Sequence, residues 1–431
     1  MTNINFLDKL RNGAEVEWKP LGLVAEYVRG LVYNKSSESS DGRGYKVLRA
    51  NNITLASNQL NLDGIKVVNF DTKVKNTQKL YKNDILISAA SGSREHVGKV
   101  AFIDANINFY FGGFMGVVRC SNGLNSRYMF HILTSDIFQK YLDETLNSST
   151  INNLNSTVMG AFKIPIPCPE NPKKSLEIQA EIVRILDAFT DLTIELITEL
   201  TTRKKQYHHY RDQLLRFENG EVEWKPLGLV AEYVRGLVYN KSSESSDGRG
   251  YKVLRANNIT LASNQLNLDG IKVVNFDTKV KNAQKLYKND ILISAASGSR
   301  EHVGKVAFID ANINFYFGGF MGVVRCSNDL NSRYMFHILT SDIFQKYLDE
   351  MLNSSTINNL NSTVMGVFKI PIPCPENPKK SLEIQAEIAR ILDTFTALTA
   401  ALAAELVSRK IQYSYYCNLL LNFSKPDEGR A

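Results

Sequence analysis

The segment SAASGSREHVGKVAFID occupies residues 88–104, and the same seventeen residues return at 294–310. Its glycines, lysine and hydroxyls resemble a phosphate-binding loop, which has the pattern GxxxxGK[ST] between a strand and a helix. The spacing does not fit, because five residues instead of four separate Gly92 from Gly98, and Val100 follows Lys99 where magnesium would need a hydroxyl. The next residues, KVAFID, have the composition of a strand. We therefore do not expect a nucleoside triphosphate to bind here.

Other patterns of catalytic or metal-binding residues are missing from the sequence. It contains no GxSxG, HExxH or GxGxxG motif and no Asp/Asn-Pro-Pro-aromatic motif of an amino-methyltransferase. His96 and His302 could act as bases, but a histidine in a polar loop is more often a hydrogen-bonding residue. The cysteines form no CxxC pair and are typical of small buried residues in a reducing compartment; they are Cys120, Cys168, Cys326, Cys374 and Cys417. The sequence predicts neither a catalytic centre nor a metal site.

The loop does supply hydrogen-bond donors and acceptors suited to DNA. An arginine such as Arg94 can bind guanine O6 and N7 with two bonds, a lysine such as Lys99 can contact a phosphate, and asparagine suits adenine N6 and N7. Similar side chains recur in the polar segments YVRGLVYNKSS, VLRANNI and SSTINN. Any one segment could be a solvated turn, but together they favour DNA binding. The candidates are Arg29, Tyr33, Lys35, Arg49, Asn51, Asn52, Ser91, Ser93, Arg94, His96, Lys99, Ser149, Thr150 and Asn152, with Arg235, Tyr239, Lys241, Arg255, Asn257, Asn258, Ser297, Ser299, Arg300, His302, Lys305, Ser355, Thr356 and Asn358 in the second copy.

These loops are duplicated because most of the chain is duplicated. Residues 15–187 and 221–393 differ at five positions, with an offset of 206. The differences are Thr77/Ala283, Gly123/Asp329, Thr145/Met351, Ala161/Val367 and Val183/Ala389. This period is too long for a solenoid repeat, so each copy is a domain with an appended element. Two such copies on one chain would naturally lie about a pseudo-twofold axis.

Each copy is predicted to be a mixed α/β domain. Short β-branched runs bounded by Gly, Asn and Asp predict strands at KVLRA, IKVVNF, DILISA, GKVAFID and GGFMGVVRC. SRYMFHILTSDIFQKYLDETL predicts one helix of about five turns, and the proline-rich FKIPIPCPENPKK is expected to end strand structure. The long connections VYNKSSESSDGRG and LNSSTINNLNST are loops on this scaffold, where recognition residues usually lie.

A long helix is predicted to follow each domain, over 175–217 in the first copy, where it would span about 65 Å. Apolar and aromatic residues recur every fourth and third position, which indicates a coiled-coil seam. When residues 188–217 are aligned with residues 394–423, fifteen of the thirty positions differ, and none of these lies on the seam. We infer that the outer faces drifted while the two helices continued to pack on each other. The seam includes Phe189, Leu196, Arg203, Tyr207 and Tyr210, then Phe395, Leu402, Arg409, Tyr413 and Tyr416.

Arg203 and Arg409 stand in the seam itself. Either they extend their charged ends to solvent along the helix surface, or they fix helix register and antiparallel orientation.

Composition places few limits on function. The chain has 431 residues, of which 44% are apolar, and a formal net charge of +7 that is compatible with nucleic acid without diagnosing it. We find no apolar run of about 18 residues and no secretory signal, so we expect a cytoplasmic protein that does not enter a membrane.

In its whole length the chain resembles a specificity subunit of a type I restriction-modification system. The motifs that carry the resemblance are YVRGLVYNKS, YKVLRANNI, DILISAASGSREHVGKVAF and KIPIPCPENPKKSLEIQAEIVRILDAFTDLT. LTIELITELTTRKKQYHHYRDQLLRF, residues 192–217, is similar to the central helix of the family. The resemblance implies an α+β fold in which two mixed α/β target-recognition domains are joined by two long antiparallel coiled-coil helices. The implied boundaries are 1–170 for the first recognition domain, 171–218 for the central helix, 219–376 for the second domain and 377–431 for the C-terminal helix and tail.

The resemblance also implies a role without chemistry. Such subunits bind double-stranded DNA and hold two methyltransferase subunits, which use S-adenosylmethionine to methylate adenine at N6. Restriction subunits that use ATP and Mg complete the nuclease. The chain itself would bind no cofactor.

One departure from the family pattern matters. Members usually carry two different recognition domains, whereas here the domains are nearly identical, so we expect an interrupted palindrome as the site. Two alternatives stay open: a coiled-coil structural adaptor that binds protein instead of DNA, and a self-contained restriction enzyme, which the missing catalytic motifs disfavour.

Overall fold

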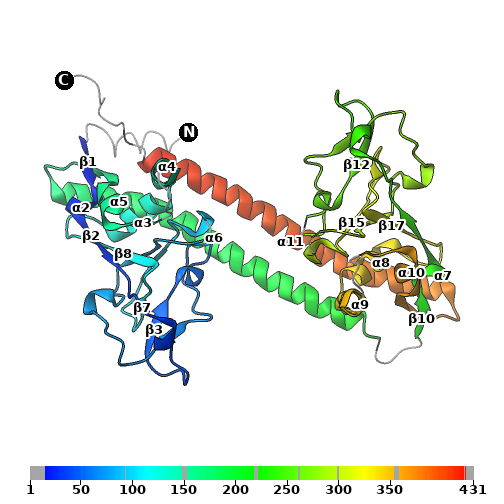
Figure 1. The fold of residues 1–431 in the computed structure, drawn as a ribbon, viewed down its shortest axis with the longest axis horizontal. Helices are drawn as coiled ribbons and strands as arrows, with labels where there is room; N and C mark the ends of the chain where they lie inside the picture. Colours follow the sequence, from blue (N-terminus) through cyan, green and yellow to red (C-terminus); the bar gives the residue numbers. More distant parts are fainter. Residues whose placement is uncertain are drawn as a thin grey trace. The chain divides into compact units, whose positions relative to one another are not determined.

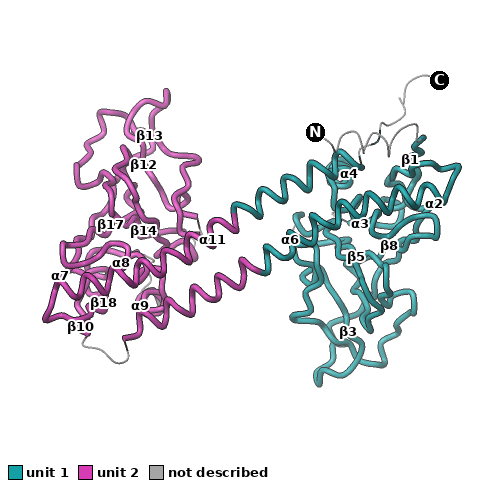
Figure 2. Tube along the Cα trace, turned by 180° about the vertical axis from the view of Figure 1, so that it is seen from behind, with its two compact units in different colours: residues 1–198, 404–431 teal, residues 199–403 magenta. Residues whose placement is uncertain are grey.

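A computed structural model describes residues 15–92, 94–147, 153–217, 222–260, 263–298, 300–353, 359–421 and 423. Its internal contacts divide the chain into two compact units, unit 1 (residues 1–198 and 404–431) and unit 2 (residues 199–403). Figure 2 colours them separately. Each unit therefore contains one repeat's mixed domain, part of that repeat's own long helix, and the end of the other repeat's helix. The boundaries suggested by the family layout stay a prediction, because the contacts group the helices differently.

Each mixed domain contains three small sheets. In unit 1 their strand orders are β2-β8-β5-β6, β4-β3-β7 and β1-β9. The bounds are β1 Val16–Pro20, β2 Ala25–Arg29, β3 Tyr45–Leu48, β4 Lys66–Val68, β5 Ile85–Ser88, β6 Val100–Phe102, β7 Tyr110–Phe111, β8 Met115–Cys120 and β9 Lys163–Pro167. The unit 2 strands are β10 Val222–Pro226, β11 Ala231–Arg235, β12 Tyr251–Leu254, β13 Lys272–Val274, β14 Ile291–Ser294, β15 Val306–Phe308, β16 Tyr316–Phe317, β17 Met321–Cys326 and β18 Lys369–Pro373.

The central strand β5 is buried on both faces, which fits its sequence ILIS, three consecutive apolar residues followed by a small serine. Ile85 and Ile87 point into the cluster shared with the helices, whereas Leu86 points into a second cluster with Val117 and Phe111. The alternation of a strand thus separates two cores, one beneath the helices and one between the sheets. All five strands predicted from sequence in each copy are confirmed, and β1, β2 and β7 were missed.

Short helices complete each domain. In unit 1 they are α2 Leu21–Val24, α3 Ser126–Thr134, α4 Asp136–Asn147 and α5 Ser156–Ala161, with one-turn 3₁₀ helices at Lys35–Ser37, Ala50–Asn52, Asn76–Gln78 and Arg94–His96. In unit 2 they are α7 Leu227–Val230, α8 Ser332–Leu339, α9 Asp342–Asn353 and α10 Ser362–Val367, with 3₁₀ helices at Lys241–Ser243, Ala256–Asn258, Asn282–Gln284 and Arg300–His302.

Two predictions about these elements are wrong. The single helix predicted over 126–146 is two helices, because Ser135 is extended (φ −87°, ψ 167°) and its hydroxyl donates to the Ile132 carbonyl, which ends α3. KIPIP, expected to end strand structure, is itself strand β9. It pairs antiparallel with β1 in a sheet of two strands. Proline is tolerated there because an edge strand leaves alternate N–H positions without a partner.

The long helices are α6 Pro172–Leu214 and α11 Pro378–Leu421. α6 begins earlier than predicted because Pro172 suits the first helical position, and the Asn171 side chain accepts from the Lys174 N–H at 3.1 Å. α6 starts in unit 1 and ends in unit 2, whereas α11 starts in unit 2 and ends in unit 1 (Figure 1). This is the connectivity that an antiparallel pair of helices requires.

Within each unit the two helices meet through the predicted seam residues. In unit 1 the ring of Phe189 stacks on that of Tyr416, with centroids 4.8 Å apart. In unit 2 Tyr210 stacks on Phe395 at 5.3 Å. Leu196 and Leu402 are half-buried along the same stripe. Side chains that meet in this way explain why the two copies kept these positions.

The seam arginines bond within their own helices. Arg203 donates to Glu199 at 2.7 Å and to Gln206 at 3.0 Å, and Arg409 makes the matching bonds to Glu405 and Gln412. About a third of each side chain stays exposed. This arrangement favours solvent-facing seam arginines over a device that sets helix orientation.

A buried histidine joins each domain to both helices. In unit 1 His131 Nε2 lies 2.8 Å from Asp187 Oδ1 of α6, and its Nδ1 lies 2.9 Å from the Tyr413 hydroxyl of α11. In unit 2 His337 bonds to Asp393 at 3.0 Å and to Tyr207 at 3.1 Å. Burial lowers the pKa of both histidines. A neutral ring donates to the aspartate through Nε2 and accepts from the tyrosine at Nδ1, so one side chain holds two helices.

Not all differences between the copies lie on outer faces, contrary to our inference from the sequence. Arg211 of α6 is 2% exposed and donates to the Thr340 carbonyl at 2.6 Å and to Asp342 at 3.1 Å. The equivalent position on α11 is the buried Cys417, and the next residue, Asn418, donates to Asp136 at 2.9 Å. Asp136 corresponds to Asp342. The loss of an arginine is therefore accompanied by a neighbouring change that contacts the equivalent carboxylate of the other repeat.

One helix meets the length and composition of a membrane span. Mean hydropathy reaches 1.4 over 18 residues of α11. The prediction from sequence rested on an uninterrupted apolar run, whereas this mean is reached in a helix whose alanine- and leucine-rich stretch TALTAALAAELV also contains polar residues. The same helix carries Phe395 and Tyr416, which stack on aromatic residues of α6. Only 6% of that 18-residue window is buried inside the structure, so these contacts cover a small part of its apolar surface.

The buried histidines make stability depend on pH. Their folded-state pKa lies below the ordinary value of 6.5, so the unfolded chain takes up protons first as the pH falls. We expect the melting temperature to fall once the pH drops below about 6.5. His131→Gln with His337→Gln should melt lower at pH 7.5 and show a flatter profile. His209→Gln, at an exposed helix position, is the control. If the double variant of the buried histidines kept the wild-type dependence of melting temperature on pH, this expectation would be contradicted.

The exchange of Arg211 for Cys417 between the copies predicts an effect on stability. Arg211→Cys leaves a buried carbonyl and Asp342 without their donor, which should cost about 1.5–3 kcal/mol. Adding Asp212→Asn recreates the residues of unit 1 and should recover part of this loss. Urea denaturation of the single and double variants measures both effects. A double variant no more stable than the single would show that the asparagine does not compensate.

Candidate nucleic-acid interface

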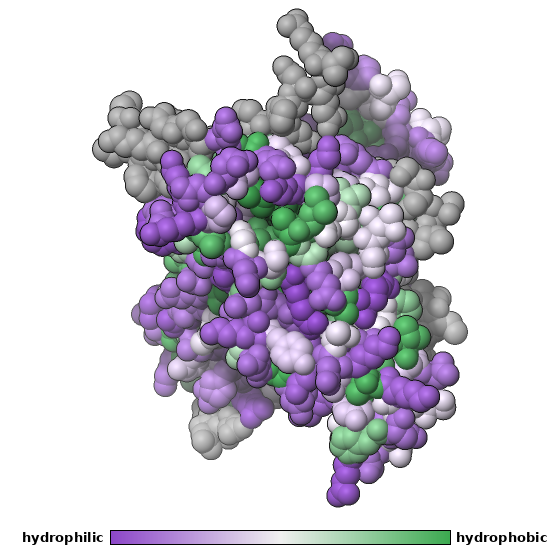
Figure 3. All heavy atoms as spheres, turned by 90° about the vertical axis from the view of Figure 1, so that its left-hand side faces the viewer, coloured by the Kyte–Doolittle hydropathy of each residue, from purple (hydrophilic) through white to green (hydrophobic). Residues whose placement is uncertain are grey.

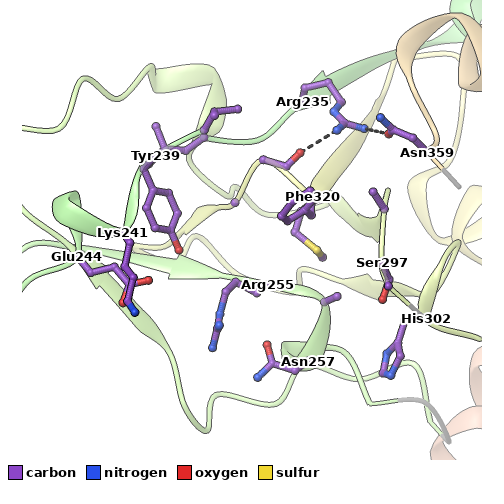
Figure 4. Close-up of a pocket in the computed structure, with 18 residues that line it drawn as sticks. Arg235, Tyr239, Lys241, Glu244, Arg255, Asn257, Ser297, His302, Phe320 and Asn359 are labelled. Carbon is purple, nitrogen blue, oxygen red and sulfur yellow. Dashed lines mark hydrogen bonds between the residues drawn. The ribbon is translucent and has the colours of Figure 1, made fainter. Parts of the chain in front are cut away.

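A cavity of about 1120 Å³ opens in unit 2. Seven residues predicted from sequence to bind DNA line it, and Figure 4 shows them around one hollow. They are Arg235, Tyr239, Lys241, Arg255, Asn257, Ser297 and His302. Residues up to 67 positions apart in the chain are thus brought together, which the sequence could suggest by residue type but not by position.

Strand pairing explains why these loops meet. β12 and β16 are parallel, with Leu254 opposite Phe317, so the carboxyl ends of both strands lie on the same side of the sheet. Arg255 and Asn257 follow one strand, and the turn to Phe320 follows the other. Leu237, just beyond β11, forms a parallel bridge with Gly318 and brings Tyr239 and Lys241 to that side.

The cavity wall is cationic with one acid. Lys241 and Arg255 line it together with Glu244, whose carboxylate accepts from Lys272 at 2.6 Å. This hydrogen bond lowers the pKa of Glu244, which therefore stays ionised at neutral pH. Burial raises the pKa of Tyr239, so its hydroxyl stays protonated. The cavity can attract phosphate, and it offers both donors and acceptors to base edges.

Unit 1 contains the same lining residues at positions lower by 206, since none of the five differences falls among them. Local contacts repeat as well. Lys66 bonds to Glu38 as Lys272 does to Glu244, and Leu31 bridges Gly112 as Leu237 does Gly318. Both units thus present the same chemistry: Arg29, Tyr33, Lys35, Arg49, Asn51, Ser91 and His96 correspond to the seven predicted lining residues of unit 2.

The guanidinium of Arg235 is engaged in hydrogen bonds within the protein. It donates to Asn359 Oδ1, to the Leu360 carbonyl and to the Gly319 carbonyl, each at 2.8 Å (Figure 4). Arg29 makes the same three contacts in unit 1, at 2.7–3.1 Å. With most of its donors engaged, this arginine joins two loops and shapes the cavity wall.

Asn52 and Asn258 were predicted to contact bases, but both side chains are completely buried. Asn258 accepts from the Arg255 N–H at 2.9 Å and donates to the carbonyls of Asn267 and Asp269. Asn52 makes the equivalent bonds. The prediction is therefore wrong for these two residues, which hold the turn, whereas the exposed neighbours Asn51 and Asn257 stay available for base contacts.

Arg94 and Lys99 lie apart from the residues equivalent to the unit 2 cavity. They line a different depression, against α4, and Arg94 forms an ion pair with Asp143 at 2.9 Å. Arg300 pairs with Asp349 in the same way, and neither Arg300 nor Lys305 lines the unit 2 cavity. The side chains of the one-turn helix Arg94–His96 point in different directions. Of these three residues, His96 alone has a counterpart, His302, that lines the unit 2 cavity.

Several predicted residues lie outside the described part of the chain, and their placement stays a prediction. They are Ser93, Ser149, Thr150, Asn152, Ser299, Ser355, Thr356 and Asn358.

Sequence reasoning also missed cavity residues, among them one acid and two exposed apolar side chains. Glu244, Val238 and Phe320 line the cavity, and Glu38, Val32 and Phe114 are their counterparts. The acid stands in the polar loop SSESS, which could have indicated it. Nothing in GGFMG signals an exposed phenylalanine, because the same letters suit a buried strand.

Comparison with known proteins identifies the family. The model for the type I restriction modification DNA specificity domain matches residues 14–203 and again residues 219–408. Together these ranges cover most of the chain, which therefore belongs to this family. The two matches fall on the two repeats, so each repeat is one specificity domain.

Relatives match over the whole length. The chain is 28% identical over 437 residues to the type I restriction enzyme EcoR124I/EcoR124II specificity subunit of Escherichia coli, with 99% of each chain covered. It is 30% identical over 443 residues to a putative type I restriction enzyme specificity subunit of Haemophilus influenzae, covering 98% of this chain and 99% of the relative.

Solved structures show the same fold. The S subunit of a type I restriction-modification system from M. genitalium aligns with a TM-score of 0.59 at 15% identity, covering 96% of this chain and 98% of that one. A chain from a study of type I R-M complex assembly gives 0.54 at 15% identity, covering 94% and 97%. The prediction of two repeated mixed α/β domains with long helices is confirmed.

Proposed function

We propose that this chain is the sequence-specificity subunit of a type I restriction-modification complex and that it performs no chemistry itself. The observation that carries the proposal is the cavity edged by Lys241, Arg255 and Asn257, formed in a domain of the DNA-specificity family. Cations there bind phosphates, and the exposed asparagine and Glu244 contact base edges.

We further propose that the target is an interrupted palindrome. Both units carry the same lining residues, so each recognises the same half-site. If a pseudo-twofold axis relates the units, the half-sites face each other in opposite orientations. Half-sites on one face of B-DNA lie about 10 bp apart, which leaves a spacer of about 5–8 bp between half-sites of 3–5 bp.

The remaining activities belong to partners. Two methyltransferase subunits would dock on the chain and use S-adenosylmethionine to methylate adenine at N6, and restriction subunits would add ATP- and Mg-dependent cleavage, in the cytoplasm where the chromosome lies. A coiled-coil adaptor without DNA contacts is the alternative. Salt-dependent binding to duplex DNA, with and without methyltransferase subunits, separates the two, because an adaptor would show no steep dependence on salt.

The symmetry of the site can be measured in cells that express the chain with its methyltransferase subunits. Sequencing of modified bases should return one motif whose two halves are reverse complements, with a spacer of about 5–8 bp. The physical reason is that the same lining residues in both units would make the same base contacts. An asymmetric motif would contradict the palindrome without excluding a specificity role.

Paired substitutions distinguish base contacts from other roles. Asn51→Ala with Asn257→Ala should relax specificity at one symmetric pair of positions, by about 1–3 kcal/mol each. Arg94→Ala with Arg300→Ala is the matched control, because these arginines lie apart from the cavity residues, in ion pairs with Asp143 and Asp349. Binding to a library of variant duplexes measures both. Relaxed specificity in the arginine variant alone would reverse the assignment.

A further inference from the structure

Two large apolar side chains stand exposed at the cavity of unit 2. Phe320 is 73% exposed and Val238 is 83% exposed, and both line the cavity. Their counterparts Phe114 and Val32 are 72% and 84% exposed. Single exposed apolar residues are common on a surface such as the face of unit 1 in Figure 3, where hydrophobic areas lie among mostly hydrophilic ones. A pair that recurs at the recognition cavity needs a more specific reason.

The two side chains come from neighbouring loops. Phe320 follows Gly318 and Gly319, and a side chain placed at Gly319 would meet Val238 Cγ2 at 2.8 Å. Val238 therefore packs against the backbone just before Phe320, and the glycine makes room for it. We call Phe320 with Val238, and Phe114 with Val32, the apolar pair of each unit.

The backbone beneath the phenylalanine is firmly held. The Phe320 carbonyl accepts from the N–H groups of Ala295 and Ala296 at 2.9 and 3.0 Å, and Arg235 holds the Gly319 carbonyl. Unit 1 repeats these bonds at Phe114, Ala89, Ala90 and Arg29. An exposed aromatic ring on a fixed turn loses little backbone entropy on binding, which suits it as an anchor.

The surrounding charge indicates the kind of partner. Lys241 and Arg255 line the same cavity as the apolar pair. An apolar protein surface would not match this cationic rim, whereas nucleic acid combines anionic phosphates with apolar base faces. Figure 4 places Phe320 among the labelled side chains of this cavity, with Arg255 and Asn257 along one side and Ser297 and His302 beside them.

We propose that the apolar pair of each unit inserts against the base stack of duplex DNA and partly unstacks one base step in each half-site. Apolar side chains that wedge between base steps kink duplexes in this way, and pyrimidine–purine steps open most easily. The pair thus adds selection for a deformable step to the hydrogen-bond contacts of the cavity. This inference rests on the proposed function.

The test uses the full chain with its methyltransferase subunits and a duplex of the methylated motif, with 2-aminopurine placed at each position in turn. Methyltransferases extrude their target adenine, so the methylated positions are left out of the comparison. Binding of the wild type should raise fluorescence at one further symmetric pair of positions. Phe114→Ala with Phe320→Ala should abolish this rise and weaken binding about 5- to 150-fold per half-site, as for loss of one base–aromatic stack. The leucine variants at the same positions should retain part of both effects.

Phe70→Ala with Phe276→Ala is the matched control. These phenylalanines are 67% and 65% exposed but pack edge-to-face on Tyr45 and Tyr251, and Phe276 does not line the unit 2 cavity. They should leave fluorescence and affinity unchanged. A wild-type complex that binds the motif tightly without any rise, or an alanine variant that keeps the rise, overturns the apolar pair while leaving the proposed function intact. Absence of any specific duplex binding by the wild type overturns both.

Discussion

The structure depends on a buried neutral histidine that bonds to two helices at once. His131 connects its domain to Asp187 of the domain's own helix and to Tyr413 of the helix returning from the other repeat. A neutral imidazole has one donor and one acceptor, so each partner satisfies one nitrogen and neither can be lost cheaply. His337 repeats this arrangement with Asp393 and Tyr207. Each domain is therefore complete only when both repeats contribute to it.

This shared construction explains how the repeats drifted. The domains stayed nearly identical, and so did the aromatic positions through which the helices stack, whereas half of the helix positions compared changed. Where a change reached the domain, as at Arg211 and Cys417, an adjacent residue supplied a different contact to the equivalent carboxylate of the other repeat. The same cavity-lining residues in both repeats are the basis for expecting two equal half-sites.

Residue types predicted more of the fold than of the site. The central strands, the duplication and the helix seam follow from periodicity, which burial enforces. The break at Ser135 and strand β9 did not follow, because local propensity cannot show which edge partner is available. Seven predicted residues gather in one cavity, but Asn52 is buried and Arg94 points elsewhere, since neighbouring letters such as Asn51 and Asn52 differ only in the direction the backbone gives them. Phe320 carried no signal because only tertiary structure exposes it.

Disulfide cross-linking tests most directly whether α11 returns to the first repeat's domain. Phe189→Cys with Tyr416→Cys replaces two rings whose centroids lie 4.8 Å apart in unit 1. Mild oxidation of this variant should link the peptides that contain residues 189 and 416, as identified by mass spectrometry. Phe189→Cys with Phe395→Cys, which pairs the two equivalent positions of the repeats, should give no link within the chain. A 189–395 link in place of a 189–416 link would mean that the helices run parallel, and would contradict this account.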